Sequence, residues 1–463
     1  MIKLTAALFI LCSSLSASAP PDTIRKYFAD GFLDSLQRKT FNYFWECVDP
    51  STGLTPDRYP TRTFSSTAAI GFALTSYGIG AEMKYVTRPA AADRVLTTLK
   101  YLYQLPQNDA PMGSAGYRGF YYHFLDFSTG TRYNRDIELS SIDTALLLAG
   151  VLFCQSYFDG AGRTEREIRS YADSLYRRVE WPWLQPRPPL MSMGWYPDKG
   201  FHHTDWNGYN EAMIMVILAL GSPTHPVKEE AWHGFTKQYQ WMKYYGMEFV
   251  SFGPLFGHQY SHAWIDFRGI RDEYMQKKGI DYHENSRRAT ISQRAYAIEN
   301  PHNMNGYSEL MWGFTACDGP ADETRTVNGV ERRFSSYSAR GVSADWVYDD
   351  GTISPTAAGG SIAFAPEICI PALKNIREKV PSVYSKYGFL DAFNLTYISE
   401  RTPNGWVDHD YLGIDQGPIL VMIENLRSGL VWDVMKKNPY IVNGLQRAGF
   451  TGGWLDQQPS KKK

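Results

Sequence analysis

Apolar residues recur at helical spacing in about a dozen segments of this chain, whereas strand-like alternation is scarce. The clearest helical segments are 33–48, 65–82, 89–104, 138–158, 164–180, 208–221, 226–245 and 413–434. Ile142–Phe153 and Ala212–Leu220 are apolar on nearly every side and must be buried all round, whereas 164–180 and 226–245 carry charge on one side. Buried helices wrapped by half-exposed ones predict an all-α fold, an (α/α)-type toroid or barrel, with a solenoid as the alternative.

The buried helices share a second feature, because polar or acidic residues fall in their first turns. These residues are Glu138, Asp143, Glu211, Glu309, Asp415 and Gln416. We therefore expect the N-termini of these helices to gather at one end of the fold. Asn207–Met213 and Asn305–Met311 are similar in sequence and predict two equivalent helix starts.

Two stretches interrupt the helical pattern, 182–207 and 319–356, and both are rich in Gly, Pro and aromatic residues. Long loops inside a compact domain are usually functional or disordered. The Trp, Tyr and His side chains in them favour ordered walls of a cleft: Trp195, His202, His203, Trp206, Trp346 and Tyr348. Because the chain contains no Pro/Ser linker or low-complexity tract, we expect residues 20–463 to form one domain.

The first residues have the pattern of a secretory signal. Lys3 precedes an apolar run from Leu4 to Leu15, and a stretch of small residues ending at Ala19 follows. A membrane anchor is the competing interpretation, but the run is far shorter than the roughly 20 residues that span a bilayer. We expect residues 1–19 to be removed and the mature protein to be exported, periplasmic or secreted, without insertion in the membrane.

Charge and composition indicate which kind of molecule the protein binds. The chain has 47 basic and 48 acidic residues, and it lacks a basic block of the kind that binds nucleic acid. Aromatic residues make up 15% of the chain and offer flat faces for pyranose rings, although a Tyr-rich core would give the same composition. We expect a neutral glycan as partner, no nucleic acid, and a monomer.

Hydrolysis of a glycoside needs one carboxylic acid to protonate the leaving oxygen and one carboxylate to activate water or attack the sugar. Glu211 is the candidate acid, because it lies between an aromatic stretch and a fully apolar helix, where partial burial raises the pKa of a carboxyl. The second carboxyl is expected among Asp136, Glu138 and Asp143, which precede another apolar helix. Capping or a favourable contact with the helix dipole is the ordinary alternative for acids at such positions.

Neither cysteine nor histidine spacing predicts a metal site or a cofactor. The cysteines after the signal, Cys47, Cys154, Cys317 and Cys369, lack C-x-x-C spacing and are expected to be buried. His258 and His262 lie four residues apart, but the glutamate of the zinc-protease pattern is missing. We expect these two histidines to bind sugar hydroxyls, together with Gln259 and Asp266. The other expected sugar contacts are Trp206, Tyr209, Trp312, Asp318, Trp346, Asp415 and Gln416.

Several motifs in fixed order resemble the glycoamylase-like domain over about residues 40–440. They are TFNYFWE at 40–46, WGFTACDGP at 312–320, DGTISPTAA at 350–358, FAPE at 364–367, YGFLDAFN at 387–394 and IDQGPI at 414–419. Among bacterial proteins with this domain, the chain is similar to glycoside hydrolase family 144. The resemblance implies an (α/α)6 barrel and cleavage of β-1,2-glucan with inversion. It also implies that Glu211 is the general acid and that the 135–143 segment holds other essential carboxyls.

Three functional hypotheses follow. The first is an endo-β-1,2-glucanase, with an exo-acting, sophorose-releasing enzyme as its alternative within the same family. The second is a polysaccharide lyase, since helical toroids also support β-elimination, but the balanced charge argues against a uronic acid substrate. The third is a glycan-binding protein without catalysis.

Overall fold

The computed structural model describes residues 21–327 and 329–458, so the expected signal at 1–19 lies outside the described residues. Its helices are α1 Pro21–Phe28, α2 Phe32–Glu46, α3 Thr67–Glu82, α4 Arg88–Gln104, α5 Ser141–Tyr157, α6 Arg163–Arg177, α7 Met213–Gly221, α8 Glu230–Thr236, α9 Phe256–Trp264, α10 Glu273–Lys278, α11 Tyr282–Glu299, α12 Pro355–Gly359, α13 Pro366–Lys379, α14 Gly413–Arg427, α15 Leu430–Met435 and α16 Pro439–Arg447. Within the described residues, none of these helices is both long and apolar enough to cross a bilayer.

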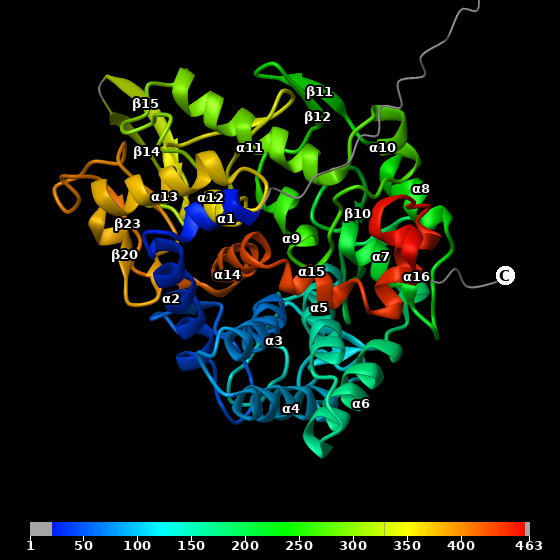
Figure 1. Ribbon diagram of the computed structural model, residues 1–463. Helices are drawn as coiled ribbons and strands as arrows, with labels where there is room; N and C mark the ends of the chain where they lie inside the picture. The colour runs from blue at the N-terminus through cyan, green and yellow to red at the C-terminus, as the bar shows by residue number, and fades with distance from the viewer. Residues whose placement is uncertain (1–20, 328, 459–463) are drawn as a thin grey trace, which may run out of the picture.

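Six of the described helices are buried along almost their whole length: α3, α5, α7, α9, α12 and α14. Each contacts the next one in that order, and α14 closes the ring against α3. In Figure 1, α3, α5, α9 and α14 lie toward the middle of the view, while α2, α4, α6 and α11 lie toward its rim. The charged helix α6 packs against α4 and α5, as its one-sided pattern predicted.

The helices expected at 33–48, 65–82, 89–104, 138–158 and 164–180 are confirmed as α2 to α6. Polar caps fix the starts of two buried helices. The Ser66 side chain accepts from the Ala69 N–H, and the Ser140 side chain accepts from the Asp143 N–H. The chain therefore enters both helices at a serine.

Two helix predictions are wrong at their C-terminal ends. The helix expected over 226–245 stops at Thr236. The chain then forms a hairpin of β11 and β12, in which Tyr245 and Gly246, with positive φ angles of 47° and 79°, reverse its direction. The helix expected over 413–434 is split into α14 and α15 at Gly429, whose φ is 73°. Apolar periodicity continues through both breaks and so could not reveal them.

The predicted equivalence of Asn207–Met213 and Asn305–Met311 is also wrong. The first segment leads into α7, but the second is a turn closed by an antiparallel bridge between Ser308 and Met311. Glu309 lies on the surface and pairs with Arg294. It is therefore not at the start of a buried helix.

The expectation of an all-α chain is correct only in part, because the loops form many short strands. They are β1 Arg58–Tyr59, β2 Ser65–Ser66, β3 Gly116–Tyr117, β4 Phe120–Tyr122, β5 Phe124–Leu125, β6 Leu139–Ser140, β7 Met191–Ser192, β8 Gly194–Tyr196, β9 Gly200–Phe201, β10 Asp205–Trp206, β11 Trp241–Tyr244, β12 Met247–Val250, β13 Ala316–Cys317, β14 Glu323–Val327, β15 Val330–Phe334, β16 Ser338–Ala339, β17 Gly341–Val342, β18 Val347–Tyr348, β19 Thr352–Ile353, β20 Tyr384–Ser385, β21 Gly388–Phe389, β22 Phe393–Asn394, β23 Trp406–Val407 and β24 Tyr411–Leu412. The protein is mostly helical, and both interrupting stretches contain ordered strands.

One antiparallel sheet brings distant loops together at the start of α5. Its strand order is β3-β4-β6-β8-β9, so β6, directly before α5, lies between β4 and β8. The 182–207 stretch thereby joins the loop that precedes α5. The 182–207 stretch and the loop before α5 therefore lie side by side in one sheet.

Close packing of α3 on α5 depends on two glycines. A Cβ atom on Gly71 would lie 2.2 Å from the Leu146 carbonyl oxygen, and one on Gly150 would lie 2.1 Å from the Gly71 carbonyl oxygen. Both obstructing atoms belong to helix backbone, which cannot move aside without shifting a whole element. The inner ring therefore tolerates no side chain at this crossing.

We predict that Gly150→Ala lowers the free energy of unfolding by about 1–3 kcal/mol, as overpacking of a core does. The matched control is Gly162→Ala, at a position where nothing lies within 4 Å of an added Cβ. Denaturant unfolding followed by circular dichroism compares the two variants. Equal unfolding midpoints for the two variants would contradict the prediction, because they would mean that the α3–α5 contact accommodates an added methyl group without loss of stability.

Candidate active site

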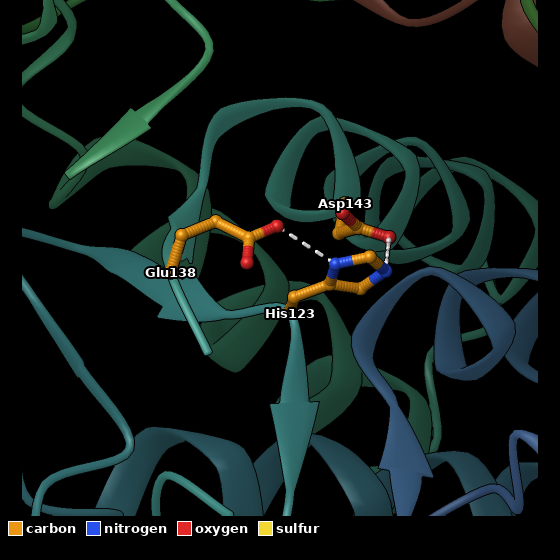
Figure 2. Close-up of side chains that lie close together, drawn as sticks. All are labelled: His123, Glu138 and Asp143. Atoms are coloured by element: carbon orange, nitrogen blue, oxygen red, sulfur yellow. Dashed lines mark hydrogen bonds and ion pairs between the residues drawn. The ribbon is translucent and has the colours of Figure 1, made fainter. Parts of the chain in front are cut away.

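The loop before α5 brings a histidine between two carboxylates. Pairing of β4 with β6 places His123 opposite Glu138, and the His123 N–H donates to the Glu138 carbonyl over 3.0 Å. Figure 2 shows the imidazole between the two acids: Nδ1 is 2.8 Å from a Glu138 carboxylate oxygen, and Nε2 is 3.5 Å from one of Asp143. Asp143 also accepts a hydrogen bond from the Ser140 hydroxyl. Both imidazole nitrogens thus face an acid.

These three groups shift one another's pKa values. Burial lowers the pKa of His123, but the charges of Asp143 and Glu138 outweigh that effect and raise it to about 9. Burial raises the pKa of Glu138, but the hydrogen bond and charge of His123 more than compensate and leave it lowered. For Asp143 burial prevails over His123, and its pKa is raised. At neutral pH the cluster holds an imidazolium beside an ionised Glu138.

Glu211 lies in the turn directly before α7, half-buried. Its carbonyl accepts from the Ser261 hydroxyl of α9 over 3.1 Å. Trp206, earlier in the same segment, donates from Nε1 to the Ser141 hydroxyl over 2.8 Å. The segment that carries Glu211 is therefore tied to the middle of α9 and to the start of α5.

The pKa of Glu211 is raised to about 7, chiefly by burial; a backbone hydrogen bond opposes the shift, and the nearby negative charge of Asp143 adds a smaller increase. Such a carboxyl is protonated over much of the range near neutrality and can still lose its proton. General acids in enzymes have this property.

Arg58 joins this cluster to a second group of acids. Its Nε is 3.2 Å from Asp57, and its Nη1 is 2.7 Å from Asp318. Asp57 lies close enough to His123 to raise the pKa of the imidazole. Beyond Asp318 lie four more buried aspartates: Asp391, Asp408, Asp410 and Asp415.

The second group, which we call the aspartate cluster, consists of Asp318, Asp391, Asp408, Asp410 and Asp415. Burial, followed by the charge of Asp318, raises the pKa of Asp408 to about 7. Burial likewise raises the pKa of Asp415 to about 7, where a hydrogen bond to Asp391 opposes the shift and the charge of Asp318 adds to it. One carboxylate oxygen each of Asp391, Asp408 and Asp415 is buried without a hydrogen-bond partner among the described residues. These carboxyls retain protons that exposed aspartates would lose.

Tyr260 of α9 lies near all three sets of acids. Burial raises the pKa of its hydroxyl well above the usual value, and the charges of Asp415, Glu211 and Asp143 raise it further. The acids of α5, α7 and α14 therefore face a shared region at one end of the inner ring, as the positions of the polar first turns predicted.

Several residues that we expected to bind sugar are part of the core instead. His258, Gln259, His262, Asp266 and Trp312 are at most 3% exposed. Gln259 donates to the Ala357 carbonyl and the Ser361 hydroxyl, and Asp266 pairs with Arg268 and Lys436. Burial lowers the pKa of His258 to about 4, so that histidine stays neutral.

This correction has a physical reason. Polar residues on α9 are buried because that helix is enclosed by the ring, and their hydrogen bonds are made to neighbouring helices. The sequence shows a polar helix face but not what covers it.

The remaining predicted residues have different environments. Asp136 is exposed on its loop, and Trp346 is 44% exposed. Tyr209 is buried against the ring of His258 at 4.8 Å, and Gln416 donates to the Phe389 carbonyl. Trp206 links the 182–207 stretch to the start of α5 through its bond to Ser141.

Three groups in the described residues hold enough donor atoms within 4.8 Å of one another to bind a metal ion. They are His123–Glu138–Asp143, Asp408–His409–Asp410 and Asp318–Asp391–Asp408. In the first, each imidazole nitrogen is already directed at a different carboxylate. An ion there would have to displace both contacts.

Sequence reasoning missed His123, Asp57, Arg58 and Asp391 as members of the site. His123 stands alone between aromatic residues in the sequence, and only strand pairing brings it to Glu138. Asp57 and Arg58 lie in a loop outside the helical pattern. Asp391, however, is part of the YGFLDAFN motif at 387–394 and could have been singled out there.

Known proteins resemble the chain along nearly its full length. Residues 203–439 match the glycoamylase family model, which is described as "Putative glucoamylase". A crystal structure from Bacteroides uniformis with the same description is 32% identical, covers 92% of this chain and 98% of that chain, and superposes with a TM-score of 0.80. An endo-β-1,2-glucanase from Chitinophaga pinensis, solved with sophorotriose and glucose, is 27% identical, covers 94% of this chain and 100% of that chain, and has a TM-score of 0.78.

A relative from Parabacteroides distasonis, named exo-β-1,2-glucooligosaccharide sophorohydrolase (non-reducing end), is 29% identical over 96% of this chain. The chain spans 61% of the length of that relative. Together with the family match over 203–439 and the structural similarity, this shows that the protein belongs to the glycoamylase family, which its motifs resembled.

Proposed function

We propose that the protein is a glycoside hydrolase that cleaves β-1,2-glucan by inversion, with Glu211 as the general acid. The observation that carries this proposal is the half-buried Glu211, whose pKa is raised to about 7 at the acid-lined end of the inner ring. A carboxyl with that pKa can donate its proton to a leaving glycosidic oxygen at neutral pH.

The choice of substrate rests on the relatives. The Chitinophaga and Parabacteroides proteins carry names that specify β-1,2-glucan or its oligosaccharides, and both align with more than nine-tenths of this chain. One of these names specifies endo action and the other exo action. We propose endo action for this protein, with release of sophorose from chain ends as the alternative.

The structure offers two places for the carboxylate that activates water. Glu138 is ionised, partly exposed and held by His123. The aspartate cluster is the other, through Asp391 or Asp415, because Asp415 lies near Tyr260 together with Glu211. Asp136 points to solvent on its loop, and Asp143 is buried behind His123, so both are weaker candidates.

We also propose that the ring of six buried helices is the inner layer of an (α/α)6 toroid, and that residues 20–463 form a single catalytic domain. We further propose that residues 1–19 are removed on export to a periplasm or beyond. The mature protein is proposed to be a monomer. The leader-like pattern at Lys3 to Ala19 supports export.

We predict that Glu211→Gln lowers kcat on linear β-1,2-glucan by about 10²–10⁴-fold, the range typical of a lost general acid. The measurement is chromatography of products over time, with purified wild-type and variant proteins. A ladder of oligosaccharides from the wild type indicates endo action, whereas a single disaccharide indicates exo action. Circular dichroism confirms that the variant is folded.

Two results would contradict the proposed function. An unsaturated product absorbing in the ultraviolet, with turnover retained by Glu211→Gln, would indicate a lyase. Binding of the glucan without any product from the wild type would indicate a glycan-binding protein.

We predict that kcat/KM falls as pH rises through about 7, because Glu211 must be protonated to act and loses its proton there. An aryl β-sophoroside with a good leaving group serves as the control, since its cleavage needs no general acid. The rate on this substrate should not fall over the same range. A fall of both rates together would assign the descending limb to another group that acts in its protonated form.

To locate the base, we predict that either Glu138→Gln or Asp415→Asn, but not both, lowers kcat on the aryl substrate as strongly as on the glucan, by about 10²-fold or more. The water-activating carboxylate is needed whichever group leaves. Loss of activity on the glucan alone would point to substrate positioning. The measurement is kcat of the wild type and of both variants on the glucan and on the aryl substrate.

A further inference from the structure

A cavity of about 510 Å³ lies between the β14–β15 hairpin and the loop that leads into β23. Its lining includes Pro320, Arg325, Tyr397, Thr402 and Trp406. We call it the Trp406 cavity. Cavities that bind small ligands in proteins typically have volumes of roughly 300–1,000 Å³. The Trp406 cavity is therefore large enough to hold a sugar residue.

Two segments of the chain connect this cavity with the aspartate cluster. Pro320 follows Asp318 by two residues, and Trp406 precedes Asp408 by two residues. The pairing of β22 with β23 continues as far as Asp408, whose N–H donates to the Ala392 carbonyl over 2.9 Å. The cavity therefore borders the aspartate cluster.

The extended backbone of β23 determines how the side chains of Trp406 and Asp408 are related. Alternate residues of a strand point to the same face and lie about 7 Å apart, since each residue advances the chain by roughly 3.3 Å. Trp406 and Asp408 are such alternate residues. Their spacing is comparable to the length of a glucosyl unit, so a glucan that contacts the aspartate cluster can also reach Trp406.

Trp406 has a packed support and an open side. It packs against the small hydrophobic cluster that contains Phe334 and Tyr397, whose rings meet edge to face at 5.0 Å. The Arg325 guanidinium lies over the Tyr397 ring at 4.6 Å, whereas the Trp406 side chain is partly exposed and lines the cavity. A supported indole beside an open cavity offers a flat apolar surface to the C–H groups on a pyranose face.

The charged side chains that line the cavity lie beside opposite charges. Arg325 pairs with Glu323 over 2.5 Å, and Glu400 is followed directly by Arg401 in an exposed turn. Such a lining suits a neutral ligand. The Arg325 guanidinium and the Thr402 hydroxyl supply polar groups that can bind sugar hydroxyls at the edge of the ring.

We propose that the Trp406 cavity is a subsite for a neutral glucosyl residue of the glucan, which stacks on the Trp406 indole. This inference rests on the proposed function. The subsite extends the glucan-binding region past the aspartate cluster, so that longer oligosaccharides make a contact that the shortest ones lack.

The test measures binding rather than turnover. Sophoro-oligosaccharides of three to six glucosyl units are titrated calorimetrically into Glu211→Gln, and into the same protein carrying Trp406→Ala or Trp406→Phe. We expect Trp406→Ala to raise Kd for the six-unit ligand about tenfold, because stacking on the indole is lost. Trp406→Phe keeps an aromatic face and should restore most of the affinity.

The matched control is Trp241→Ala in β11, which removes another partly buried tryptophan from a different part of the rim in Figure 1. It should leave Kd unchanged, and circular dichroism checks that every variant is folded. The same Kd at every ligand length with and without Trp406→Ala would overturn the subsite but leave the proposed function standing. No binding of any sophoro-oligosaccharide to Glu211→Gln or to the wild type would overturn both.

Discussion

The acid-lined end of this protein depends on cations placed between carboxylates. His123 lies between Glu138 and Asp143, and Arg58 lies between Asp57 and Asp318. Without these two positive charges, acids packed this closely in a poorly solvated region would repel one another and take up protons. His123 keeps Glu138 ionised, whereas Glu211 has no cationic partner among the described residues and keeps a high pKa. Different environments thus give similar carboxyls different protonation states at one end of the inner ring.

The inner ring supplies the framework for these charges. The starts of α5, α7 and α14 bring Asp143, Glu211 and Asp415 to the shared region around Tyr260. Close contact between α3 and α5, made possible by Gly71 and Gly150, keeps the ring narrow. Short strands then connect the loops, and the antiparallel sheet through β4, β6 and β8 determines which loop residues meet. The helices thus place the acids, and the short strands hold together the loops around them.

Much of this arrangement could be predicted from the sequence, and the failures have physical causes. Fully apolar segments such as Ile142–Phe153 identified buried helices, because only burial on all sides is compatible with such a surface. Glu211 was predicted to be partly buried with a raised pKa from its position between aromatic and apolar stretches, and both properties are found. The polar face of α9 misled the prediction for His258, since burial of polar groups against neighbouring helices leaves no trace in one sequence. His123 was missed because its role arises from strand pairing between distant residues, which single-sequence periodicity does not report.

The hydrogen bond from Trp206 to the Ser141 hydroxyl has a consequence for how such proteins can diverge. It fixes the segment of Glu211 to the start of α5 at a point where the long 182–207 stretch has already returned to the ring. Insertions or deletions earlier in that stretch can therefore change the loops around the acids while the spacing of the acids stays constant. Proteins with this helical ring can in this way differ in the length of glucan that they accept, because the loops change while the arrangement of the acids is retained.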